Sequence, residues 1–110
     1  MKKCSYVWKG ENMNNIESGV NIFKALADQT RLKIVVSVFD EEKSVSSISK
    51  DLNISQSAVS HQLQILKLYA IVKSERRGKE VYYSLNDHHV KNIIDQVFNH
   101  ASHTKDEKTV

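Results

Sequence analysis

The 110-residue chain has no proline and only three glycines, so it lacks the residues that usually build linkers. We therefore expect one domain, with a single core that gains stability from dimerisation. The lone cysteine, Cys4, excludes an internal disulfide and suits a reducing compartment. No apolar run reaches the ~18–20 residues that span a bilayer, and no signal-peptide pattern opens the chain. These absences predict a cytoplasmic protein without a membrane partner.

The chain also lacks the side-chain arrangements on which enzymes depend. We find no nucleophile paired with a base and no phosphate-binding loop, so we expect neither an enzyme nor a small organic substrate. The fraction of charged residues is ordinary, and the net charge is +3 at pH 7. This slight basic excess permits a polyanionic partner but does not by itself demand one.

Helical spacing of apolar residues begins only after a first segment without periodicity. Residues 1–11 are expected to be poorly ordered, and Tyr6 and Trp8 have no assigned role. Residues 13–27 form the first predicted helix. Asp28 is a suitable N-cap for a second helix. The residues of this second segment predicted to face inward are Leu32, Val35, Val36 and Phe39.

Two further helices, separated by a tight turn at Asn53, predict a helix-turn-helix. Ser46 is the expected cap of a short helix over 47–52, and Ser55 is the expected cap of a longer one over 56–69. The longer helix has an apolar face, with Val59, Leu63 and Leu66. Its other face is polar and includes Gln56, Ser57, Ser60 and His61.

Residues 72–85 change to a period of two, which predicts a β-hairpin whose turn is residues 77–79. A hairpin directly after the longer helix is a wing, so the expected fold is mainly α with a small β-hairpin (α+β), a winged helix-turn-helix. A final helix begins near Asn86 and completes the domain, 12–103, before a flexible tail, 104–110. The residues that this helix is expected to bury are Val90, Ile94, Val97 and Ala101.

The polar helix face and the hairpin form a candidate interface for double-stranded DNA. Glutamine pairs with adenine in the major groove, and short serines let the helix approach closely, which favours Gln56, Ser57, Ser60 and His61 as contacts. The basic hairpin residues Arg76, Arg77 and Lys79 would meet phosphate or the minor groove. The alternative is a solvated polar surface and a solubilising hairpin, or a winged-helix module for protein contacts.

The final helix carries four of the five histidines. At ~100° per residue, His89, His100 and His103 share one face, preceded by Asp87, whereas His88 lies elsewhere on the helix. Because His89 and His100 are roughly 16 Å apart along the axis, one helix cannot surround a metal ion. Two antiparallel copies can, and the ligand types suit zinc or cobalt. The alternative is a solvated helix end whose histidines bind nothing.

Two motifs, FKALADQTRLKI at 23–34 and ISQSAVSHQL at 54–63, resemble the ArsR/SmtB family of metal-sensing repressors. The likeness covers residues 16–103, although Gln29 stands where the family commonly has proline. The Asp-x-His-x10-His-x2-His spacing from Asp87 to His103 is similar to the zinc-sensing, CzrA-like branch. The 46–52 segment lacks the Cys-x-Cys pair of arsenic, cadmium or lead sites, and Cys4 alone cannot replace it.

The resemblance implies a homodimer formed through the N- and C-terminal helices. It also implies that the apo dimer binds operator DNA and that Zn(II) (or Co(II)) at Asp87, His89, His100 and His103 releases it, derepressing metal-resistance or efflux genes. It further implies a bond from His100 to a backbone carbonyl near Ala70. The alternatives are a winged-helix regulator of a non-metal signal and a protein-interaction module.

Overall fold

The computed structural model describes the backbone of residues 12–109 and the side chains of residues 15–103. The expectations for Cys4, Tyr6, Trp8 and the whole 1–11 segment therefore lie outside the described residues. The elements in chain order are α2 (Asn12–Leu26), α3 (Gln29–Ser37), β1 (Lys43–Ser44), α4 (Val45–Leu52), α5 (Gln56–Leu68), β2 (Val72–Arg77), β3 (Glu80–Leu85) and α6 (His88–Thr109). This order confirms the predicted winged helix-turn-helix.

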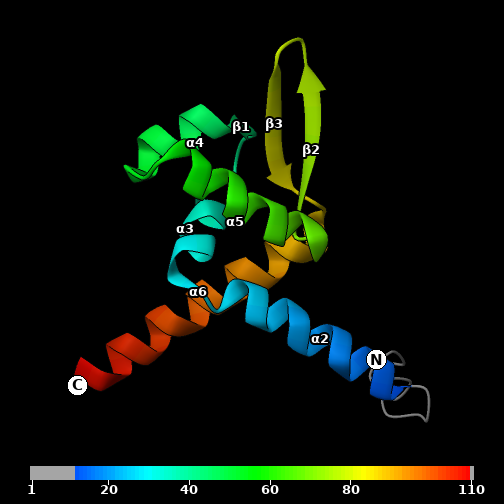
Figure 1. The fold of residues 1–110 in the computed structure, drawn as a ribbon. Coiled ribbons are helices and arrows are strands. Elements are labelled where there is room, and N and C mark those ends of the chain that lie inside the picture. The colour runs from blue at the N-terminus through cyan, green and yellow to red at the C-terminus, as the bar shows by residue number, and fades with distance from the viewer. Residues whose placement is uncertain (1–11, 110) are drawn as a thin grey trace.

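The short helices and the sheet gather on one side of the molecule, while α2 and α6 diverge from it (Figure 1). No helix among the described residues is long and apolar enough to cross a membrane.

The core lies where α3, α4 and α5 meet the sheet. The predicted inward face of α5 is confirmed, because Val59, Leu63 and Leu66 are fully buried. In α3 the prediction is partly wrong: Val36 is 47% exposed, whereas Ile34 is fully buried. The two side chains lie roughly 200° apart around the helix, so one helix face cannot bury both.

The predicted N-caps of α3 and α5 are confirmed. The Asp28 carboxylate accepts a hydrogen bond from the Arg31 backbone N–H at 3.0 Å, and the Ser55 hydroxyl accepts one from the Ala58 N–H at 3.1 Å. Both caps satisfy amide groups that a helix start leaves without an intrahelical partner. The start of α5, the longer helix predicted to contact DNA and named the recognition helix below, is therefore fixed by its own sequence.

The predicted cap of α4 is wrong by two residues. Ser44, not Ser46, accepts the Ser47 N–H, at 3.2 Å. Ser44 is paired with Tyr82 in the sheet and has an extended backbone, with φ −82° and ψ 165°. An N-cap residue needs this backbone conformation, so the strand β1 supplies the cap and α4 begins earlier than expected.

The sheet is antiparallel with the order β1-β3-β2. The hairpin of β2 and β3 is confirmed, and its turn is Gly78-Lys79, with Gly78 at φ 64°, a left-handed conformation that glycine adopts readily. Arg77 was expected in the turn but is the last residue of β2. Tyr83 and Leu85 are buried, as the period of two predicts.

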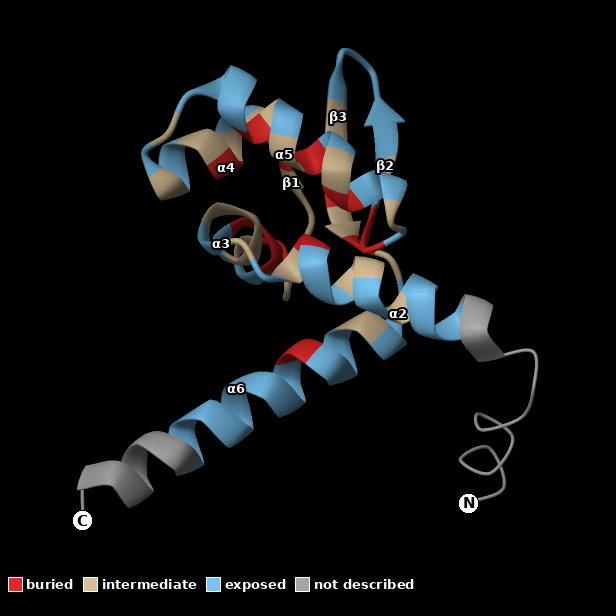
Figure 2. Cartoon of the chain, turned by 60° about the horizontal axis from the view of Figure 1, so that its bottom comes forward, coloured by how far each residue is buried: buried red, intermediate tan, exposed pale blue. Residues whose placement is uncertain are grey.

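The distal half of α6 extends away from the core (Figure 2). Ile94 is 3% exposed, but Val97 is 50% exposed and Ala101 is exposed, so the predicted burial of these two is wrong within one chain. The helix continues to Thr109, past residue 104, where the flexible tail was expected. The side chains of 104–110 lie outside the described residues, and their flexibility stays a prediction.

Candidate nucleic-acid interface and metal half-sites

The turn between α4 and α5 sets the direction of the recognition helix. Asn53 takes a left-handed backbone at φ 57°, which short polar side chains tolerate. The Ser49 hydroxyl then donates to the Ile54 carbonyl across the turn. These contacts are local, so the angle between the two helices follows from the sequence of the turn itself.

Three of the four predicted contact residues on α5, Gln56, Ser57 and His61, are exposed, and Ser60 is half-buried. Ser57 and His61 lie roughly 160° around the helix from the buried Val59, whereas Gln56 and Ser60 lie at the edge of the buried apolar face. Ser57 also lies with its hydroxyl 3.3 Å from the hydroxyl of Ser55. The first turns of α5 thus present short, polar side chains to solvent, as entry into a major groove requires.

The three predicted hairpin residues do not share one environment. Arg76 and Lys79 are exposed, and Lys79 lies in the turn. Arg77 is bound by two acids: it donates to Glu42 and, at 2.9 Å, to Glu75, and it lies 5.2 Å from the centre of the Tyr82 ring. These carboxylates raise the pKa of the Arg77 guanidinium, the Glu42 hydrogen bond most of all.

Arg77 therefore anchors the wing, whereas Arg76 and Lys79 are better placed for phosphate. Glu75 is two residues from Arg77 in β2, but the contact of Arg77 with Glu42 was not predicted from the sequence. Glu42 precedes Arg77 by 35 residues, and only the pairing of β1 with β3 brings the two together. Nothing in the sequence around Glu42 indicates that its carboxylate would reach the hairpin.

The environments of the two arginines predict different effects on DNA binding. Replacing Arg76 by methionine should lower the slope of log affinity against log salt concentration by about 0.9, the value for one lost phosphate contact on duplex DNA. Replacing Arg77 by methionine should leave that slope nearly unchanged, because its charge is already paired. Fluorescence anisotropy with duplex DNA at several salt concentrations measures both. Equal changes in slope would contradict this division of roles.

The wing is also tied to the recognition helix. The Lys67 ammonium donates to the Ser74 hydroxyl at 2.8 Å, joining the last turn of α5 to β2. The hairpin strands are paired along their whole length, from Val72 with Leu85 to Arg77 with Glu80. The last turn of α5 is thus bonded directly to the wing.

Two of the predicted metal ligands lie together at the start of α6. The Asp87 Oδ2 is 3.5 Å from the His89 Nδ1. Ligand atoms of a tetrahedral zinc, each at about 2.1 Å, are about 3.4 Å apart, so this pair has the spacing of two ligands of one ion. We call Asp87 and His89 the near half-site.

Asp87 has a second role that accounts for part of its geometry. Its Oδ1 accepts the Val90 N–H at 3.1 Å, as an N-cap of α6 does. This backbone hydrogen bond, and secondarily the neighbouring His89, lower the pKa of the Asp87 carboxyl. The group is therefore a carboxylate at neutral pH, with Oδ2 facing His89.

The other two predicted ligands, His100 and His103, lie one turn apart on the distal, exposed half of α6. We call them the far half-site. Among the described residues of one chain, no group of three or more histidine, cysteine or acidic side chains is close enough to hold a metal ion. His88, which the helix angle excludes as a ligand, stacks near His89 with ring centres 4.4 Å apart.

A cavity of about 250 Å³ adjoins the near half-site. It lies where α2, the end of α5 and the start of α6 meet, and most of its lining is apolar. The Ala70 backbone on its wall is left-handed, at φ 59°. Asp87 and His89 therefore line the same cavity as Tyr69 and Ala70, which directly follow the recognition helix. Its lining residues include Ile22, Leu26, Tyr69, Ala70, His89 and Val90.

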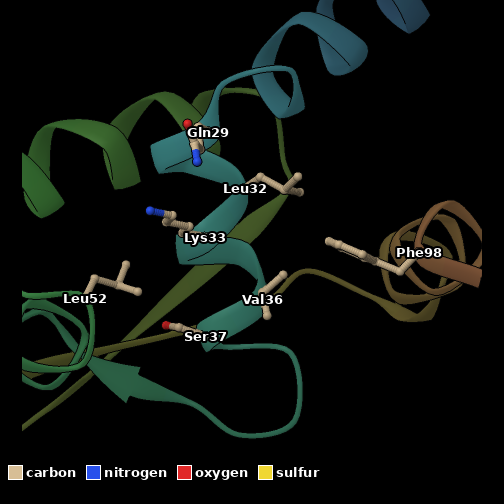
Figure 3. Close-up of a pocket in the computed structure, with 7 residues that line it drawn as sticks. All are labelled: Gln29, Leu32, Lys33, Val36, Ser37, Leu52 and Phe98. Atoms are coloured by element: carbon tan, nitrogen blue, oxygen red, sulfur yellow. The ribbon is translucent and has the colours of Figure 1, made fainter. Parts of the chain in front are cut away.

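A second hollow separates α3 from the distal half of α6 (Figure 3). It has a volume of about 400 Å³, and Phe98 points from α6 toward Leu32 and Val36 on α3. Leu52 of α4 closes its other end. Phe98 is 44% exposed, so this α3–α6 groove is an apolar surface that one chain leaves open.

The arrangement of helices and wing matches a known group of proteins. The sequence profile of the arsR family of bacterial regulatory proteins matches residues 28–74. A transcriptional repressor SmtB homolog from Synechocystis sp. is 38% identical over 89 residues, which cover 81% of this chain and 67% of that relative. The chain belongs to the arsR family. It is thus a DNA-binding transcriptional regulator of a family that contains no enzymes, and regulators of this family bind operator DNA and form homodimers.

Other arsR-family relatives differ in the roles their names give. A cadmium resistance regulatory protein CadC homolog from Staphylococcus aureus is 41% identical over 72% of this chain and 66% of its own length. The structure of reduced HlyU from Vibrio cholerae has a TM-score of 0.74 at 32% identity, covering 81% of this chain and 94% of that one. HlyU is named a transcriptional activator. The likeness alone therefore leaves the signal open.

Proposed function

We propose that this arsR-family chain is a cytoplasmic transcriptional repressor that responds to metal ions. Its apo homodimer binds operator DNA, and Zn(II) (or Co(II)) bound between the two chains weakens that binding and derepresses metal-resistance or efflux genes. The observation that carries the proposal is the near half-site: a carboxylate and an imidazole lie at ligand spacing, and the imidazole is on the same helix face as two distal histidines. The zinc-sensing, CzrA-like branch has the same ligand spacing.

The dimer in this proposal is formed by α2 and α6. On α2, Ile16, Val20 and Phe23 are 45%, 44% and 67% exposed and form one stripe. The buried Ala25 lies roughly 180° around the helix from Ile16, so the stripe faces away from the chain's own core. An apolar stripe of this kind, unpartnered on a regulator whose family forms homodimers, is suited to a second copy.

The exposed apolar residues of α6 continue this surface. Ile93 and Val97 are 42% and 50% exposed, and around the helix they lie between the buried Ile94 and the histidine face. A two-fold partner would cover this stripe, and the α2 stripe of that partner would cover the α3–α6 groove. Because an isologous interface uses the same surfaces twice, both apolar stripes are covered at once.

Pairing α6 antiparallel with its copy places the near half-site of one chain against the far half-site of the other. Each dimer then has two equivalent sites, each with three imidazoles and one carboxylate. When bound, the ion supplies the charge that holds the two half-sites together. Four protein ligands complete a tetrahedron without an open position, which suits sensing and not catalysis.

The cavity beside Ala70 supports a route from these sites to the recognition helix. A partner's histidine bound at the near half-site would lie close to the end of α5. The His100 ring could then donate its second N–H to a carbonyl near Ala70, as metal-bound imidazoles generally do to outer partners. Linkage requires that DNA weaken metal binding by the same factor by which metal weakens DNA binding.

The decisive test is a zinc titration of the purified dimer bound to a duplex selected from a random library. We expect zinc to lower the DNA affinity by roughly 5- to 150-fold, the usual range of coupling between two sites. Magnesium at the same concentration, which prefers oxygen ligands, serves as the control. DNA affinity that is unchanged by zinc and by cobalt would rule out the proposed response.

Zinc affinity should also depend on pH. Histidines ordinarily titrate near ~6.5, and protons compete with zinc for imidazole nitrogen, so lowering the pH from 8 to 5.5 should weaken zinc binding. The Asp87 carboxyl contributes little to this change, because its pKa is lowered and it stays ionised over that interval. Isothermal titration calorimetry at several pH values measures the effect. Affinity that is flat across this interval would argue against imidazole ligands.

The alternative is an arsR-family regulator of the same fold with a non-metal signal. The likeness to HlyU, whose name specifies no metal, favours it. It predicts operator binding that is indifferent to zinc. A module for protein contacts would instead show no DNA binding with a steep dependence on salt concentration.

A further inference from the structure

One side chain, Arg31 of α3, binds both the dimer helix α2 and the recognition helix α5. Its Nε–H donates to the Ala25 carbonyl at 2.7 Å, and an Nη2–H donates to the Lys24 carbonyl at 3.5 Å. An Nη1–H donates to the Gln62 Oε1 at 2.9 Å. Asp28 holds the Arg31 backbone N–H at 3.0 Å, which fixes the first turn of α3 beneath this contact.

The contact with α2 follows from the chemistry of a helix end. The carbonyls of Lys24 and Ala25 lie in the last turn of α2, where the helix dipole is negative and carbonyls can accept further donors; the Lys24 carbonyl also accepts the Ala27 N–H at 3.2 Å. A guanidinium is always charged and has donors in a rigid, planar fork, so it can bond two acceptors in fixed directions. Arginine therefore caps α2 and still has a donor pointing toward α5.

The contact with α5 is made beside the proposed DNA surface. Gln62 follows His61 in the sequence and is half-buried, between the exposed polar face of α5 and its buried apolar face. Its amide oxygen accepts a hydrogen bond from the Arg31 guanidinium. Rotation of α5 about its axis, or sliding along that axis, would break this bond. The bond therefore fixes the direction of the recognition helix relative to the end of α2.

We propose that the Arg31 guanidinium, the Lys24 and Ala25 carbonyls and the Gln62 amide form a positioning clamp. This clamp fixes α5 relative to α2, so a change in how α2 and α6 pack in the dimer reaches the DNA-binding surface through α2, Arg31 and Gln62. The second part of this inference rests on the proposed metal response, and the first part does not. Arg31 and Gln62 are positioning residues that touch neither metal nor, in this proposal, DNA bases.

A role in helix capping alone would make different predictions. If Arg31 only stabilised the end of α2, removing the Gln62 acceptor would leave function unchanged, because the Ala25 bond would remain. Gln62→Leu is therefore the informative variant, since it cuts the link to α5 and keeps the cap. Arg31→Lys retains the charge but lacks the fork that reaches both acceptors.

The distance between α2 and α5 within one chain tests the clamp without metal or DNA. Nitroxide labels at Glu17→Cys and Gln64→Cys, both exposed positions, in a Cys4→Ser background report that distance by pulsed electron paramagnetic resonance. Diluting labelled chains with excess unlabelled protein isolates the intrachain signal. We expect Gln62→Leu and Arg31→Lys to broaden or shift the distance distribution.

The matched control is Lys67→Met, which cuts a side-chain bond from the same helix to β2 and leaves α2 untouched. It should not change the α2–α5 distances. A Gln62→Leu distribution identical to that of the parent would overturn the clamp. If Arg31→Lys fails to fold, Gln62→Leu still decides the question, because the α2 cap is intact in that variant.

A functional measurement separates the clamp from the metal proposal. If zinc releases operator from the parent protein, Gln62→Leu should reduce the ratio of apo to zinc-loaded operator affinity by about 2- to 30-fold, the range that single residues of a coupled network produce. An unchanged ratio would remove the clamp from the signalling route. If the parent ignores zinc, the metal response fails, while the distance measurement still accepts or rejects the clamp.

Discussion

Replacing His100 by alanine is expected to abolish zinc-driven release of operator DNA and to leave apo operator binding within about twofold of the parent, as for an exposed surface substitution. The two effects separate because the distal half of α6, to which His100 belongs, extends away from α5 and the wing of its own chain (Figure 1). The variant should thus become a repressor that zinc no longer switches.

The expected loss is large because one ligand in four is removed from a closed site. Losing only an outer hydrogen-bond partner of a metal ligand typically costs 10–100-fold in metal affinity, so losing a ligand should cost more than about 100-fold. At micromolar zinc the His100→Ala dimer would then stay on DNA. Anisotropy titrations of operator binding with and without zinc measure both arms of the prediction.

His88→Ala is the matched control, since it removes an exposed imidazole from the same helix. His88 lies roughly 120° around the helix from His100, so it should not bind an ion held by the histidine face, although its ring contacts that of His89. Zinc should therefore release the His88→Ala dimer as it releases the parent. Loss of zinc response in both variants, or loss of apo DNA binding by His100→Ala, would refute the assignment of these roles.

The parts of the fold that were predicted correctly depend on local chemistry. Asp28 and Ser55 cap helices because a capping side chain bonds an amide three residues away. The buried set on α5 follows the helical repeat, and the hairpin follows a period of two with Gly78 at its turn. Each of these signals lies within a few residues of the structure that it determines.

The parts that were missed depend on contacts between distant segments. The strand β1 has two residues, too short for any periodic pattern, yet it moves the cap of α4 to Ser44. The same pairing brings Glu42 to Arg77 and makes this arginine an anchor of the wing. Val97 fitted the apolar pattern of α6 but is half exposed in the single chain; periodicity marks the apolar face of a helix without showing which of its residues the core of the same chain covers.

For the candidate sites, the sequence spacing predicted which helix face a residue lies on but not which other residues it contacts. The short Asp87–His89 distance agrees with the proposed near half-site, while the joining of the two half-sites stays a prediction that depends on a second chain. The Arg31–Gln62 contact had no sequence signal, because the two residues lie on different helices 31 positions apart. The assignment of bases and phosphates to individual side chains likewise stays a prediction.

Replacing Phe23 by glutamate should dissociate the dimer and, with it, most of the affinity for a two-fold operator. Phe23 is 67% exposed in the single chain, so the carboxylate would stay solvated in a monomer but would be buried without a partner in the proposed interface. Because two linked half-sites bind far more tightly than one, the monomer should lose at least about 100-fold in operator affinity. Sedimentation velocity and anisotropy on the same samples measure the two losses.

The control for this variant is Ser18→Glu, which adds the same charge to the same helix. Ser18 is exposed and lies roughly 160° around α2 from Ile16, away from the apolar stripe. Ser18→Glu should therefore remain a dimer, and circular dichroism should show that both variants keep the helical fold. A Phe23→Glu protein that sediments as a dimer and binds operator like the parent would mean that the α2 stripe is not the interface, and the antiparallel pairing of α6 would then need a different support.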